Sequence, residues 1–139
     1  MRNRIKKGQL FFFTLSLVIM FGITIVVAQE GLLDGKVFVG QYSENHKRGA
    51  VKEDELRFMN REFQSIVYGQ RGFNEGVYTD RAEEDKIYFE AKTVSPKRGK
   101  IKWRGIVHGE SIEVNYRWSK KGWLSDTERD YSFNGTLKK

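Results

Sequence analysis

The feature that most constrains the fold is an alternation of apolar and polar residues, with a period of two, through almost all of the sequence after residue 36. The pattern is clearest at 87–93, 101–107 and 111–118, where every second side chain is apolar or small. Successive side chains of a strand point to opposite faces, so the pattern predicts strands with one buried face. Pro96 is the only proline, and no stretch after residue 28 has a helical period. The sequence therefore predicts an all-β domain.

Turn residues divide this pattern into about eight short strands. Asn60 and Arg61 are expected at the turn of one hairpin, which places Phe58 near Phe63 across the strands. The segments 44–55, 81–85 and 119–128 are rich in charged or turn-forming residues and are expected as loops. The expected strands lie near 37–42, 55–59, 62–67, 77–79, 87–93, 100–107, 111–118 and 131–137.

Eight antiparallel strands in sequence can close as an up-and-down barrel or stack as a small β-sandwich. The barrel is favoured, because successive hairpins pair in sequence order and closure leaves no exposed strand edge. A barrel of this size is either filled by side chains or has room for one small ligand. Twelve large aromatic residues in or beside the expected strands favour a filled interior.

The first 28 residues differ from the rest of the sequence. Arg2, Arg4, Lys6 and Lys7 precede an apolar run at 10–28, and this order is typical of an export signal. The 19 residues of the run are long for a signal and close to the about 20 that a membrane span needs. A cleaved signal and a retained anchor helix are therefore both open. We expect a signal peptide or membrane anchor at 1–28 and a β domain at 29–139, exported to the periplasm or the extracellular space.

The charge of the protein argues against a nucleic-acid partner. The formal net charge is +7, but four of the 25 Lys and Arg residues lie in 1–28, which leaves 21 against 18 Asp and Glu. Lys102 and Arg104 are expected on the face opposite Trp103, whereas a single-strand platform presents aromatic and basic groups together. The sequence has no cysteine, so the domain is stabilised by packing and not by disulfides.

Three stretches of the sequence show a family-level resemblance. They are Leu33-Asp34-Gly35-Lys36 before the first expected strand, the hairpin segment 102–110 (KWRGIVHGE), and the closing segment 133–137 (FNGTL). With the N-terminal signal, this layout resembles small exported bacterial proteins, many of uncharacterised function, with a calycin-like or lipocalin-like barrel. The resemblance implies an antiparallel β-barrel and assigns no site residues.

Side chains suited to catalysis or metal binding are few. His46 lies in an expected charged loop and His108 in an expected turn, and neither has the sequence context of a catalytic base. The acidic groups at 53–55 and 83–85 lack the alternating ligands and central glycine of a calcium loop. A Gly-x-Ser-x-Gly elbow is also absent from the sequence. We therefore expect no enzymatic activity, no cofactor and no metal.

Aromatic and basic residues indicate two kinds of binding. Trp103, Tyr116 and Trp118 are candidate ligand-binding residues, because such rings at a barrel mouth suit a small apolar ligand. The basic stretch 97–104 instead suits an anionic lipid or cell-wall polymer. We expect an exported non-enzymatic binding module for a small apolar ligand or a cell-envelope partner. The alternative is a membrane-tethered structural or interaction domain that contacts the membrane through 1–28.

Overall fold

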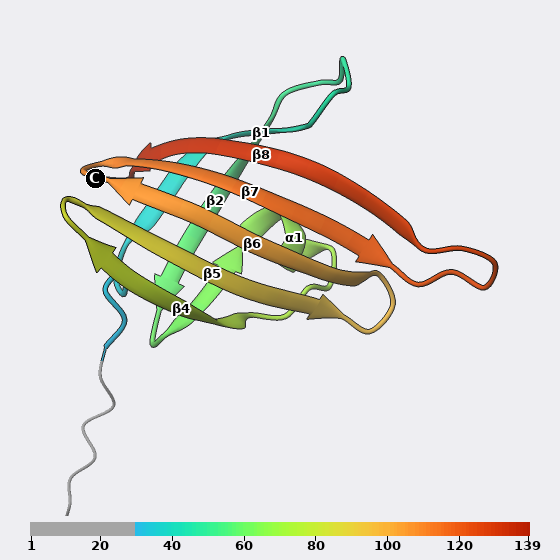
Figure 1. Cartoon of the computed structure of the whole chain (residues 1–139), viewed down its shortest axis with the longest axis horizontal. Helices are drawn as coiled ribbons and strands as arrows, with labels where there is room; N and C mark the ends of the chain where they lie inside the picture. Colours follow the sequence, from blue (N-terminus) through green and yellow to red (C-terminus); the bar gives the residue numbers. More distant parts are fainter. Residues whose placement is uncertain (1–29) are drawn as a thin grey trace, which may run out of the picture.

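The computed structural model describes residues 30–139, and the expected signal or anchor at 1–28 lies outside them. In the described part, eight antiparallel strands form a closed barrel in the order β1 to β8 (Figure 1). Each strand pairs with its neighbours in the sequence, and β8 closes the ring by pairing with β1. The prediction of an all-β domain, and of a barrel in preference to a sandwich, is confirmed.

The strands differ in length, and this makes the barrel asymmetric. β3 has four residues and pairs with β4 at two positions only, whereas β5 to β8 have ten or eleven residues each. A short helix, α1 (Ile66–Gln70), follows β3. The strands are β1 (Val37–Glu44), β2 (Lys52–Met59), β3 (Glu62–Ser65), β4 (Gly76–Glu83), β5 (Lys86–Ser95), β6 (Gly99–His108), β7 (Ser111–Lys120) and β8 (Thr127–Leu137).

All three expected loops contain strand residues. β7 ends at Lys120 and β8 begins at Thr127, both inside the expected loop 119–128. β2 begins at Lys52, inside the expected loop 44–55, and β4 extends to Glu83, inside the expected loop 81–85. Most charged residues of these strand ends, such as Glu53 of β2 and Arg81 of β4, are at exposed positions, where a charge does not have to be buried. The runs of charged residues at 44–55 and 81–85 therefore predicted loops where the structure has the start of β2 and the end of β4.

Helix α1 corrects the expected strand 62–67 and the prediction that the domain has no helix. Ser65 caps the helix, because its Oγ accepts a hydrogen bond from the Tyr68 N–H at 3.1 Å. Asp54 of β2 accepts a second bond, 3.0 Å long, from the Val67 N–H. The first turn of α1 is thus held in part by Asp54, which lies 13 positions before Val67 in the sequence.

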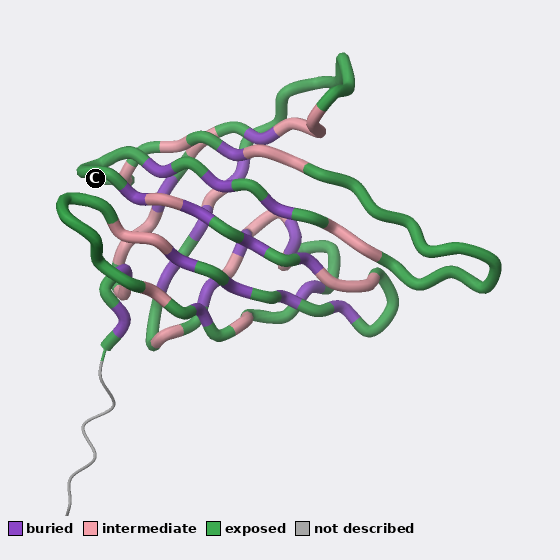
Figure 2. The backbone as a smooth tube through the Cα atoms, in the orientation of Figure 1, coloured by how far each residue is buried: buried purple, intermediate pink, exposed green. Residues whose placement is uncertain are grey.

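The apolar face of each strand points into the barrel. Figure 2 shows buried and exposed residues alternating along the strands, as the period of two predicts. Phe58 and Phe63 face each other across β2 and β3 with ring centroids 5.2 Å apart, as expected. Gly105 pairs with Phe89, whose ring occupies the space that a Cβ at Gly105 would need.

The two ends of the barrel are built differently. The N-terminal end holds residues 30–36, the C-terminus and the short turn between β6 and β7 (Figure 1). Leu33 is fully buried at this end. The Asp34 carboxylate accepts hydrogen bonds from the Tyr78 hydroxyl at 2.6 Å and the Arg61 N–H at 3.0 Å. The opposite end, here called the loop end, holds the β1–β2, β5–β6 and β7–β8 connections.

Candidate functional site

Two of the three candidate ligand-binding residues lie together in the barrel interior. The Trp103 and Tyr116 rings have centroids 4.2 Å apart, and the two residues are 2% and 3% exposed. Trp103 Nε1 donates to Thr93 Oγ1 at 3.0 Å, and the Tyr116 hydroxyl lies 3.1 Å from that of Tyr68. Burial raises the pKa of the Tyr116 hydroxyl far above its usual range, so the group is neutral. Both side chains are held as parts of a packed core.

Trp118, the third candidate, lies at the loop end, where it packs against the edge of the core. It is half-buried, and its Nε1 donates to the Arg98 carbonyl oxygen at 2.7 Å. The Arg129 guanidinium carbon lies 5.7 Å from its ring centroid, within the range of a cation–π contact. Trp118 therefore ties the β5–β6 turn to the neighbouring strands.

Aromatic rings are in contact across the whole interior. Neighbouring centroids in this series are 4.2–6.1 Å apart, close to the range for aromatic pairs in contact. Among residues 30–139, every buried side-chain nitrogen or oxygen has a hydrogen-bond partner. The interior thus offers no unpaired polar group to orient a ligand. In order, the rings are Phe38, Phe58, Phe63, Trp103, Tyr116 and Tyr131.

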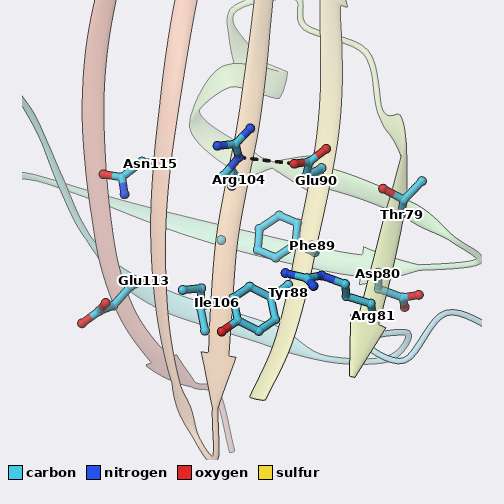
Figure 3. A pocket seen from close by; sticks show the side chains of 11 residues that line it. Thr79, Asp80, Arg81, Tyr88, Phe89, Glu90, Arg104, Ile106, Glu113 and Asn115 are labelled. Atoms are coloured by element: carbon cyan, nitrogen blue, oxygen red, sulfur yellow. Dashed lines mark ion pairs between the residues drawn. The ribbon is translucent and has the colours of Figure 1, made fainter. Parts of the chain in front are cut away.

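Three adjoining hollows lie on the outer face of β4–β8. Figure 3 shows the first, an open hollow of about 650 Å³ over β4 to β7. Arg104 Nε lies 3.3 Å from Glu90 Oε1 there, and the Arg81 guanidinium carbon lies 4.4 Å from the Tyr88 ring centroid. These contacts place charged groups and one aromatic face on the same wall.

A second and a third hollow continue this surface toward the loop end. The second, of about 850 Å³, shares Glu90, Arg104 and Asn115 with the first. The third, of about 630 Å³, shares Lys102 and Arg117 with the second. We call the three together the outer groove. Its exposed side chains Arg104 and Asn115 alternate along β6 and β7 with Trp103 and Tyr116, which are buried and also border the second hollow.

The third hollow is strongly basic. Six lysines and Arg117 line it, against only Asp126 and Glu128. Arg117 is neutralised, since its Nε lies 2.7 Å from Asp130 Oδ1, and this contact lowers the pKa of Asp130. Within residues 30–139, none of the six lysines forms an ion pair. They are Lys92, Lys97, Lys100, Lys102, Lys120 and Lys121.

Some of the basic residues of this hollow could be predicted from the sequence alone. The basic stretch 97–104 is visible in the sequence, but Lys92 and Lys120 join it only through strand register. Lys92 pairs with Lys102 between β5 and β6, and Lys100 pairs with Ser119 between β6 and β7. Basic residues at outward positions of three neighbouring strands, Lys92 of β5, Lys102 of β6 and Arg117 of β7, are the signal that could have predicted it.

The two histidines lie apart. His108 Nε2 is 2.7 Å from Asp85 Oδ2 on an exposed surface at the N-terminal end, and this hydrogen bond lowers the pKa of Asp85. His46 is exposed in the β1–β2 loop at the other end. In the described part of the protein, no group of three or more histidine or acidic side chains could hold a metal ion.

Comparisons with protein-family models, with curated proteins and with solved structures give no match for this protein. A search of residues 30–139 finds no helix with the length and apolar character needed to cross a membrane.

Proposed function

We propose that the protein is an exported, non-enzymatic binding module that contacts a cell-envelope partner through its outer groove and not through the barrel interior. The observation that carries this proposal is the packing of Trp103 and Tyr116. Their rings are 4.2 Å apart, and their polar atoms already have partners inside the protein. A ligand in the interior would have to displace these contacts.

The chemistry of the outer groove favours an extended polar partner. Ion pairs such as Glu90–Arg104 sit beside exposed amides such as Asn115, so the groove offers donors and acceptors of both signs. Tyr88 adds an aromatic face to the first hollow. Protein interfaces combine such charged, amide and aromatic groups.

Site-specific photocrosslinking in the producing cell tests this proposal. A photoreactive amino acid replaces Asn115 in the groove, and the matched control carries it at Met59, which is 59% exposed on β2. Asn115 lies on β7, and β2 is three strands away from β7 around the eight-stranded ring. We expect a discrete crosslinked product from position 115 and none from position 59.

Charge reversal makes the test specific. The Arg104→Glu variant places a second acidic group beside Glu90 and should weaken the crosslink from position 115. Equal crosslinking from both positions, or none from position 115, contradicts the proposed use of the outer groove.

A further inference from the structure

We propose that the partner at the loop end is an anionic phospholipid surface, with Trp123 and Leu124 entering its interfacial layer and the third hollow holding lipid phosphates. This inference rests on the proposed function, since it names the occupant of one end of the outer groove. Three independent features of the described residues support it: the exposed apolar tip, the unpaired lysines and the charge difference between the barrel ends.

The β7–β8 connection presents two large apolar side chains to solvent. Trp123 is 94% exposed and Leu124 is 88% exposed, the highest values among the exposed large hydrophobic residues. Figure 1 shows this hairpin extending beyond the rest of the barrel, so its tip can reach a surface before the barrel wall does. Tryptophan favours the membrane–water interface, where its ring is apolar and its N–H remains hydrated.

Basic side chains lie at the base of this tip. Lys120 and Lys121 directly precede the tip, and the β5–β6 turn adjoins them, because a Cβ on Gly99 would lie 3.1 Å from Lys120 Cα. The same turn carries Lys97 and Arg98, which are exposed. In an anionic membrane, the phosphates lie outside the acyl chains. An apolar tip can therefore enter the layer next to the acyl chains while the cations at its base contact the phosphates.

The charge of the domain is concentrated at this end. Residues 29–139 contain 21 basic and 18 acidic residues, of which the third hollow holds seven and two. The rest of the domain therefore has 14 basic and 16 acidic residues. The N-terminal end includes the consecutive acids Glu83, Glu84 and Asp85. The resulting field orients the loop end toward a negative surface.

Vesicle binding tests the inference. The full-length protein is compared on vesicles of phosphatidylglycerol mixed equally with phosphatidylcholine and on vesicles of phosphatidylcholine alone. The same comparison uses residues 29–139, which include every strand of the closed ring, after their cooperative unfolding has been verified. We expect binding to the anionic vesicles, lower binding to the zwitterionic ones, and a blue shift of the emission of Trp123 on binding.

Two pairs of variants separate the loop end from general charge attraction. Lys120→Gln/Lys121→Gln should lower the vesicle partition coefficient of residues 29–139 about 30-fold, since each basic residue near an anionic surface contributes about fivefold. The matched control, Lys138→Gln/Lys139→Gln, removes the same charge at the N-terminal end, where both lysines form ion pairs. It should change partition less than about threefold. Trp123→Ala/Leu124→Ala should abolish the blue shift, and Leu32→Ala/Met59→Ala should preserve it.

Three outcomes overturn the inference: equal losses from the two lysine pairs, unchanged binding in Trp123→Ala/Leu124→Ala, or equal binding to both kinds of vesicle. The second outcome would indicate an anionic polymer bound by charge alone. If the vesicle test fails but crosslinking from position 115 succeeds, the proposed function stands and only its lipid partner is wrong. Failure of both experiments rejects the proposed function as well.

Discussion

At the scale of single residues, the barrel closes through direct backbone contact between two glycines. Gly40 of β1 pairs with Gly135 of β8 at the junction that completes the ring. A Cβ at Gly40 would lie 2.0 Å from the Asn134 carbonyl oxygen, a distance that no side-chain rotation can relieve. Only glycine fits at position 40, because β1 and β8 lie too close together there for a Cβ.

The Gly40→Ala variant should lower the free energy of unfolding by about 1–3 kcal/mol, the usual cost of forcing an extra carbon into a packed site. Gly49→Ala is the matched control, because a Cβ at Gly49 has no neighbour within 4 Å. It should change stability by less than about 0.5 kcal/mol. Denaturant titration of both variants measures the difference, and equal stabilities would show that the β1–β8 junction can open without cost.

Residues at regular strand positions could be predicted from the sequence, but residues at the ring closure could not. Alternation correctly placed Trp103 inside and Lys102 outside. The absence of a side chain at Gly105 leaves room for the Phe89 ring of the neighbouring strand. The pairing of Gly40 with Gly135 joins the first and last strands, and local patterns carry no information about contacts so distant in the sequence.

At the scale of elements, two segments outside the strands are each fixed by one carboxylate. Asp34 holds the turn before β1. Burial alone would raise its pKa, but hydrogen bonds from Tyr78 and from the Arg61 and Gly31 N–H groups outweigh burial and lower it. Asp54 holds the start of α1, and there the loss of solvation outweighs the bonds from Ser65 and Val67 and raises the pKa.

These opposite shifts predict opposite pH dependences. A lowered pKa means that the contribution of Asp34 is present above the unfolded value of about 3.9 and is lost as the pH falls below it. The destabilisation by Asp34→Asn should therefore be largest near neutral pH. A raised pKa means that the contribution of Asp54 is present at low pH and is lost as the pH rises through the folded value. The destabilisation by Asp54→Asn should decrease with rising pH.

Unfolding free energies of the two variants and the natural protein, between about pH 3 and about pH 7, measure both slopes. Slopes of the same sign would mean that one carboxylate is not bound as described. Neither carboxylate role is readable from the sequence. Asp54 lies in a run of charges, Glu53-Asp54-Glu55, and its partner Ser65 comes from the next strand. The five residues of α1 are also too few to produce a helical period.

At the scale of the whole molecule, the architecture follows from hydrophobic periodicity, whereas the binding surface follows from strand register. Local hairpins in sequence order were enough to predict the meander that closes as a barrel. Register then places lysines of β5, β6 and β7 around one hollow, and the loop end acquires a charge that the modest net charge of the domain conceals. The count of aromatic residues favours a filled interior, but it does not give the packing of the rings, such as the contact between Trp103 and Tyr116.

Native mass spectrometry tests the central claim, that the barrel is solid and binds at its surface, most directly. The sample is the Lys120→Gln/Lys121→Gln variant purified from the envelope or secreted fraction of the producing cell, so that lipid held at the loop end is removed. We predict the mass of the bare polypeptide, 16.3 kDa for the whole protein or less after cleavage of the N-terminal segment. A small apolar molecule that remains bound to this variant in a fixed ratio would place the binding site inside the barrel and contradict the account.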